Sequence, residues 1–169
     1  ESRGLGDVYK RQGTFSNDGT VILQGTETVS LTQDVNSGTF EYAGDGDATA
    51  DARTIIDFGA TDYFNLIIND ENATPANRDT FAAGAALTVA GDFTITDGAV
   101  TTTTNNLAVT GNMSVATDGS FVSTSGTETI TGNLTNAATF TAGTGTTDIN
   151  GNLTMSAGTF TATSGTMTC

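Results

Sequence analysis

Apolar and polar residues alternate through the second half of the chain, in a pattern that recurs about every twenty residues. Four glycines mark this repeat at intervals of 20, 21 and 19 residues, and each is followed by Asp or Asn. An apolar residue lies two positions before each glycine and another two positions after it. Period-two alternation predicts short β-strands with one buried face. The glycines are Gly91, Gly111, Gly132 and Gly151, followed by Asp92, Asn112, Asn133 and Asn152, with Val89, Val109, Ile130 and Ile149 before them and Phe93, Met113, Leu134 and Leu153 after them.

Each unit contains a second apolar position, two residues after a small residue. These positions are Val100, Phe121, Phe140 and Phe160, and nine residues separate each of the first three from the next aliphatic position. The same interval after Phe160 reaches Cys169, so we interpret this cysteine as a small core residue. The chain has no histidine and no second cysteine, so Cys169 has no sequence partner for a nucleophilic or metal-binding role. The sequence thus ends inside a repeat, and we expect the natural protein to continue.

A unit of this length cannot bury its apolar face alone, so we expect the units to stack. The predicted fold is all-β: a parallel β-helix (β-solenoid), right-handed and three-sided, with about 20 residues per coil. Strand spacing predicts about eight coils and roughly 40 Å for residues 13–169. Stacking aligns Phe93 with Leu153 in one column and Val100 with Phe160 in another. A third corner is indicated by Asn105, Gly126, Gly145 and Gly165.

Two polar features of the repeat carry further expectations. The Asp or Asn after each glycine fits a turn, where short polar side chains tolerate left-handed conformations and can form ladders between coils. Asn136 interrupts an inward column, so it needs a hydrogen-bond partner or a position that is not fully buried.

Residues 13–86 carry a weaker version of the pattern, whereas residues 87–169 form the regular coils. Gly13-Thr14-Phe15 and Gly38-Thr39-Phe40 repeat the triplet at 158–160, and apolar residues at 21–31, 55–58 and 64–68 predict further strands. Two irregular segments, 43–53 and 69–80, are expected to be loops that project from one side of a single solenoid.

The first twelve residues are interpreted as a non-native segment. Residues 2–12 read SRGLGDVYKRQ, which resembles the translation of a transposase adapter used in DNA sequencing libraries. This segment contains three of the five basic residues, leaving only Arg53 and Arg78 in the rest of the chain. A basic arm for nucleic acid at the N-terminus is therefore discounted.

The chain is strongly acidic, with a formal net charge of −14. Such a charge repels nucleic-acid phosphates and anionic lipid surfaces, so we expect no nucleic-acid partner. No stretch approaches the roughly twenty apolar residues of a membrane span, so we expect no membrane insertion.

Candidate chemical motifs fail when their residues are compared with what the chemistry requires. The segment from Asp45 to Asp51 begins like a calcium loop, but Ala50 stands at the glycine position and Ile56 at the glutamate position. Paired carboxylates for glycoside hydrolysis are sparse on the regular coils. We therefore predict no enzyme activity and no catalytic, cofactor-binding or metal-binding residues. Glycosylation sequons occur at Asn72, Asn112, Asn133 and Asn152.

Outward threonines have two interpretations. Pairs such as Thr139 with Thr141 and Thr159 with Thr161 resemble the hydroxyl arrays of ice-binding solenoids. The columns are interrupted by Ala99, Val122 and Asp148, and threonine is also simply a good strand residue. We favour solvated strands.

Part of the sequence resembles the β-helix repeats of very large secreted bacterial surface proteins. The resemblance lies in Tyr63-Phe64-Asn65-Leu66-Ile67-Ile68-Asn69, in residues 86–95 (ALTVAGDFTI) and in the Gly-Asn-Leu-Thr units at 132 and 151. That family joins a Phe-Tyr-Asn-Leu-Thr-Ile-like strand to Leu-Thr-Val-x-Gly-Asn-Leu-Thr-like coils. Here the aromatic pair is inverted and Ile67 replaces threonine. The resemblance implies an extracellular, adhesin-like or cell-surface role without a shared catalytic site.

The sequence therefore predicts a structural repeat region of an extracellular surface protein, such as an adhesin shaft, stalk or fibre. Two alternatives remain. One is a filament subunit that self-associates through open solenoid ends, because neither terminus shows a polar cap. The other is a module that binds carbohydrate or a cell-surface ligand through the irregular loops.

Overall fold

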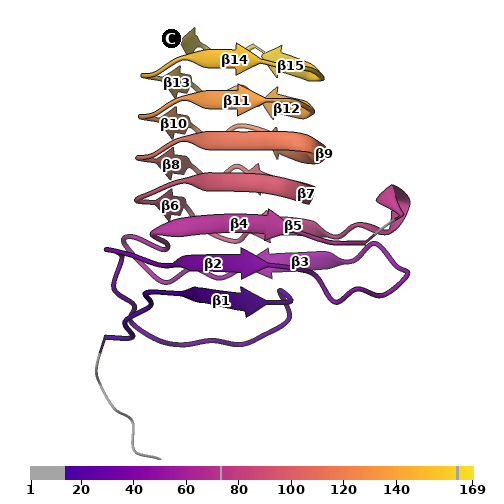
Figure 1. Cartoon of the computed structure of the whole chain (residues 1–169). Helices are drawn as coiled ribbons and strands as arrows, with labels where there is room; N and C mark the ends of the chain where they lie inside the picture. The colour runs from indigo at the N-terminus through magenta and orange to yellow at the C-terminus, as the bar shows by residue number, and fades with distance from the viewer. Residues whose placement is uncertain (1–13, 73, 163) are drawn as a thin grey trace, which may run out of the picture.

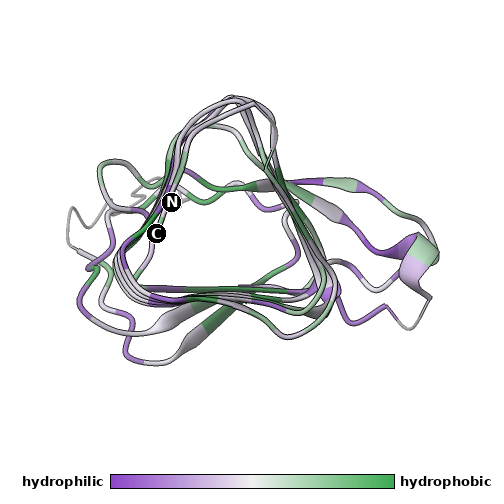
Figure 2. Cartoon of the chain, turned by 90° about the horizontal axis from the view of Figure 1, so that it is seen from above, coloured by the Kyte–Doolittle hydropathy of each residue, from purple (hydrophilic) through white to green (hydrophobic). Residues whose placement is uncertain are grey.

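The computed structural model describes residues 14–72, 74–162 and 164–169, which form a β-solenoid of about seven turns. Seen from above, the stacked coils share a triangular outline (Figure 2). In Figure 1 the strands nearest the viewer run from left to right, fainter strands lie behind them, and later coils lie higher. This winding is right-handed. The predicted three-sided parallel β-helix is therefore confirmed.

Short strands line the three faces, and every strand pair is parallel. The first face consists of β1 (Thr20–Leu23), β2 (Thr39–Tyr42), β4 (Asn65–Asn69), β7 (Phe93–Thr103), β9 (Met113–Ser123), β11 (Leu134–Asn136) and β14 (Leu153–Met155). The second face consists of β3 (Ala52–Ile55), β5 (Thr80–Ala83), β12 (Thr139–Ala142), β15 (Thr159–Ala162) and the ends of β7 and β9, which bend around the corner and join the two faces. The third face consists of β6 (Leu87–Val89), β8 (Leu107–Val109), β10 (Glu128–Ile130), β13 (Thr147–Ile149) and β16 (Met167–Thr168).

The core is a set of apolar columns that run along the solenoid. Strand register places each inward side chain above its counterpart, as the repeat predicted. Along the second face, the rings of Phe121, Phe140 and Phe160 stack with centroids 4.7 and 5.0 Å apart. The first column contains Val21, Phe40, Leu66, Phe93, Met113, Leu134 and Leu153.

The repeated glycines allow neighbouring coils to approach closely. The amide of Gly111 donates to the carbonyl of Gly91 at 2.9 Å, and that of Gly132 donates to Gly111 at 3.0 Å. A Cβ atom built on Gly132 meets the Gly111 carbonyl oxygen at only 2.3 Å. Any larger residue at this corner therefore disturbs the backbone ladder between two coils.

The Asp and Asn residues after these glycines form the expected ladder. The side-chain oxygen of Asp92 accepts the amide of Asn112 at 2.7 Å, and the same contact continues from Asn112 to Asn133 and from Asn133 to Asn152. The left-handed conformation that Asp and Asn tolerate is not used at this corner. Among the described non-glycine residues only Thr103 has a positive φ. At the glycine corner, side-chain oxygens of Asp and Asn accept the backbone amides of the next coil, so no left-handed turn is needed.

Asn136 is fully buried, and its side chain is satisfied. Its amide nitrogen donates to the carbonyls of Ala138 and Thr159 at 3.1 and 3.0 Å, and its oxygen accepts the amide of Ala138 at 3.3 Å. The first of the two sequence alternatives for this residue is therefore correct.

Several expectations for the N-terminal half are corrected. Val29 and Leu31 lie outside strands, and Phe40 belongs to the first-face column whereas Phe160 belongs to the second. The triplet at 13–15 starts at a residue outside the described ranges. There are about seven turns instead of eight, because 26 residues separate Phe40 from Leu66 and 27 separate Leu66 from Phe93.

Cys169 comes directly after β16, whose residues Met167 and Thr168 pair with Thr147 and Asp148. Its expected burial is wrong, however, because the side chain is exposed. It lies on the last described coil, with no further coil stacked over it.

We predict that Gly132→Ala lowers the free energy of unfolding by about 1–3 kcal/mol, because the new methyl group overlaps the Gly111 carbonyl. Urea titration followed by circular dichroism measures the change. Gly84→Ala is the matched control, since the nearest atom to its new Cβ is 4.0 Å away. Equal losses in the two variants would contradict close packing at the glycine corner.

Candidate functional site

Two loops project from the corner between the first and second faces. β7 and β9 pass this corner without a break, but in two earlier coils the chain leaves it through residues 43–51 and 70–79. The second loop contains η1 (Pro75–Asn77), at the far edge of the projection in Figures 1 and 2. We call the two segments the lateral loops. The predicted boundaries extended slightly too far, because Arg53 lies in β3, Asn69 in β4 and Thr80 in β5.

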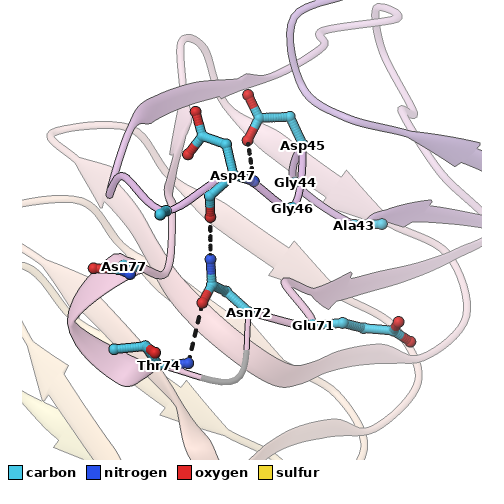
Figure 3. A pocket seen from close by; sticks show the side chains of 10 residues that line it. Ala43, Gly44, Asp45, Gly46, Asp47, Glu71, Asn72, Thr74 and Asn77 are labelled. Carbon is cyan, nitrogen blue, oxygen red and sulfur yellow. Dashed lines mark hydrogen bonds between the residues drawn. The ribbon is translucent and has the colours of Figure 1, made fainter.

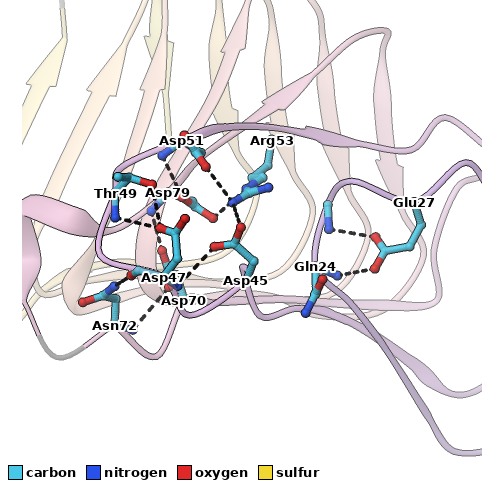
Figure 4. Close-up of polar contacts among 11 residues, drawn as sticks. Gln24, Glu27, Asp45, Asp47, Thr49, Asp51, Arg53, Asp70, Asn72 and Asp79 are labelled. Carbon is cyan, nitrogen blue, oxygen red and sulfur yellow. Dashed lines mark hydrogen bonds and ion pairs between the residues drawn. The ribbon is translucent and has the colours of Figure 1, made fainter.

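Arg53 joins the two lateral loops through carboxylates. Its Nε contacts Asp79 at 2.7 Å, and its Nη2 contacts Asp45 at 2.5 Å and Asp51 at 3.0 Å (Figure 4). Asp45 and Asp51 belong to the first loop and Asp79 to the second. Because Arg53 and Asp79 are buried, this ion-pair cluster fixes the roots of both loops.

The position of Arg53 is unusual for a charged residue. It lies directly beside Phe81 in the inward column of the second face, where later coils place Val100 and the stacked phenylalanines. Burial lowers its pKa, but hydrogen bonds and charge attraction from Asp79 and Asp45 outweigh this effect and raise the pKa above its usual value. The guanidinium therefore stays charged in the core.

Backbone groups complete the cluster. The second oxygen of Asp79 accepts the amide of Asp51 at 2.8 Å, while the Asp79 amide donates to buried Asp70. Asp70 also accepts the amide of Asn72 at 3.2 Å. Both buried aspartates thus have several partners each, which lowers the cost of burying their charge.

Carboxylate oxygens of Asp45, Asp51 and Asp79 lie within 4.8 Å of one another, a spacing that also suits metal ligands. Here the guanidinium of Arg53 already supplies the positive charge, and a divalent ion would have to displace it. The calcium loop considered for residues 45–51 would also not contain Asp79, because Asp79 belongs to the other lateral loop. The arrangement is therefore a carboxylate cage around arginine.

Arg78 forms a second cluster on the same corner. Its Nε lies 2.5 Å from Asp97 and its Nη1 lies 3.2 Å from Asp118, two aspartates that stack on one another between β7 and β9. Burial raises the pKa of Asp97, while the charge of Arg78 opposes that shift. Arg53 and Arg78 are the only basic residues after residue 12, and both lie at this corner in the described part of the chain.

A hollow of about 570 Å³ lies between the lateral loops and is open to solvent (Figure 3). Its polar lining includes Asp47, Glu71, Asn72, Thr74 and Asn77. Hydrogen bonds from the side chain and backbone of Thr49 lower the pKa of Asp47, so this exposed carboxylate is ionised at neutral pH. The Asn72 side chain donates to the Asp47 carbonyl and accepts the amide of Thr74, which links the two loops across the hollow.

The other residues singled out from the sequence do not gather into a site. The sequon residues Asn112, Asn133 and Asn152 are exposed members of the corner ladder, whereas Asn72 lies at the hollow. Thr139 stacks on Thr159 and Thr141 on Thr161, but Ser120 and Val122 occupy the preceding coil. The outward hydroxyl array thus covers only two coils before it is broken.

Sequence reasoning missed the roles of Arg53, Asp70 and Asp79. Arg53 could have been found, because it precedes inward Ile55 by two residues and period two puts both on one face. Asp79 could not, since its partner lies 26 residues earlier and the loops between them have no periodicity.

Comparisons with known proteins add no identification. No protein-family model matches the chain, and neither a curated protein nor a solved structure matches it. Among the described residues, no helix has the length and apolar character needed to cross a membrane.

We predict that Arg53→Met destabilises the fold by about 3 kcal/mol, because it leaves the buried charge of Asp79 without its partner. Urea unfolding measures the loss, and limited proteolysis should show faster cleavage within residues 43–51 and 70–79. Adding Asp79→Asn to this variant should restore part of the stability, because it removes the unpaired charge. A single Arg53→Met variant within about 0.5 kcal/mol of the parent would show that the cage contributes little.

Proposed function

We propose that this chain is a rigid, non-enzymatic segment of an extracellular surface protein, such as an adhesin shaft, stalk or fibre. The observation that carries the proposal is the unbroken stacking of about seven turns around one apolar core. Each coil contacts chiefly the coils directly before and after it, so length grows with coil number while cross-section stays constant. That geometry suits a spacer better than an enzyme, which needs residues from several elements to converge.

The extracellular part of the proposal rests on the resemblance to repeats of secreted bacterial surface proteins. The acidic surface is consistent with it, because net charge keeps a long repetitive protein soluble. End-to-end self-association and glycan recognition stay predictions.

Pulling the chain from its two ends tests the shaft directly. In single-molecule force spectroscopy we expect stepwise extension, with each step releasing one coil of about 20 residues, or roughly 70 Å of extended chain. A variant that lacks residues 133–151 joins Gly132 to Asn152 and keeps the Gly-Asn-Leu-Thr register. It should fold and lose one step. Unfolding of the whole chain in a single event at low force would argue against a shaft that resists mechanical force.

A second candidate function is ligand binding at the hollow between the lateral loops. The observation that favours it is the fixation of both loops by Arg53 and Arg78, which holds a polar hollow in place at one corner of the solenoid. Loops that served only as connections would not need two buried or half-buried ion-pair clusters. Hydroxyl-rich ligands such as carbohydrates match the exposed carboxylates and amides of its lining.

Glycan-array binding of the purified chain tests this second function. The double variant Asp47→Ala, Asn77→Ala removes two polar groups from the hollow and should reduce binding at least tenfold. Thr129→Ala, on the third face, is the matched control and should bind like the parent. Absence of binding by the parent chain, or equal binding by both variants, would remove the hollow as a carbohydrate site.

A further inference from the structure

Three polar side chains point into the core at the corner between the second and third faces. Ser123 ends β9 and Glu128 begins β10, so the two flank the same turn, formed by residues 124–127. Thr102 lies at the same corner one coil earlier. Thr101 pairs with Val122 and Thr103 with Ser123, so Thr102 is the extra residue of a β-bulge. The register thus brings oxygen-bearing side chains from two adjacent coils to one corner.

All three side chains are buried and incompletely hydrogen-bonded. Thr102 and Glu128 are 0 % exposed and Ser123 is 3 % exposed. The hydroxyl of Thr147 donates to Glu128 Oε2 at 2.8 Å. Glu128 Oε1, Ser123 Oγ and Thr102 Oγ1 have no hydrogen-bond partner among the residues that the structure describes. Buried polar atoms almost always have a partner, so three such atoms at one corner require an explanation.

The carboxylate of Glu128 limits which ligand could satisfy these three oxygens. In its column it follows Leu107 and precedes Thr147, so neither neighbour carries a charge. Arg53 and Arg78, the only basic residues after residue 12, are paired with aspartates at a different corner. A buried carboxylate is costly unless it is paired with a cation or coordinates one, and a single neutral hydroxyl donor does not compensate it.

We propose that this corner binds a small monovalent cation such as sodium. Glu128 Oε1 supplies the negative charge, and the oxygens of Ser123 and Thr102 supply neutral ligands. Hard cations prefer such all-oxygen ligand sets, and the acidic surface raises their local concentration. One carboxylate balances a single positive charge, whereas calcium sites usually contain several carboxylates. The cation would tie together two coils of the shaft.

Thermal unfolding of the full chain tests the site, in sodium chloride and in choline chloride at equal ionic strength. Sodium in tenfold excess over its dissociation constant should raise the midpoint by roughly 3–6 °C relative to choline, which is too large to enter the corner. Glu128→Gln preserves the side-chain shape and should abolish the difference. The double variant Thr102→Val, Ser123→Ala should reduce it.

Asp148→Asn is the control, because this carboxylate lies at an outward position on the same face, one coil later. It should keep the full difference between sodium and choline. In crystals soaked with thallium(I), an anomalous peak beside Glu128 would support the site in the unaltered chain. Equal midpoints in the two salts, or a difference that survives Glu128→Gln, would overturn the proposal.

Discussion

The placement of every residue above its counterpart in the next coil is the constraint on which this structure depends. Parallel strands about 4.8 Å apart bring the side chains of one column into direct contact. Most inward columns therefore stack apolar residues on apolar residues, and at the glycine corner the backbone stacks on backbone. This is why Gly111, Gly132 and Gly151 recur, since a Cβ on any of them meets the carbonyl of the preceding glycine at 2.3–2.4 Å.

The same constraint explains where irregular structure is tolerated. Each coil depends chiefly on its two neighbours, so a coil can leave the common path at one corner provided that it returns in register. The lateral loops do this between β2 and β3 and between β4 and β5, and the strands after them pair in parallel with their counterparts. At that corner the ion pairs of Arg53 and Arg78 take the place of the continuous strand pairing between β7 and β9.

The buried polar groups of the solenoid are hydrogen-bonded or charge-balanced in different ways. Asn136 satisfies itself with backbone groups of its own coil and the next. Arg53 is balanced by three aspartates. Glu128 has a single hydroxyl donor and sits in a column of leucines, a threonine and a methionine, which sets it apart from the other two. A solenoid with one loop-bearing corner and one internal polar corner is thus built from one repeat, with local exceptions.

The alternation of apolar residues and the interval between glycines were enough to predict the coils, their columns and the Asx ladder, because these features depend on contacts that repeat with the sequence. The burial of Arg53 was also readable from its spacing to Ile55. The candidate site was less predictable. The hollow and the cage combine residues from two loops without periodicity, so Asp79 and Asp45 meet only because β3 stacks on β5.

The sequence by itself determined that this chain is a stack of parallel coils, since a period of about twenty residues with alternating burial has no other way to cover its apolar face. Tertiary structure decided how the exceptions are accommodated: which aspartates surround Arg53, that the Asx corner is not left-handed, and that Glu128 faces the core beside unpartnered hydroxyls. These outcomes depend on which side chains meet between coils, and distances across loops are not encoded in local spacing.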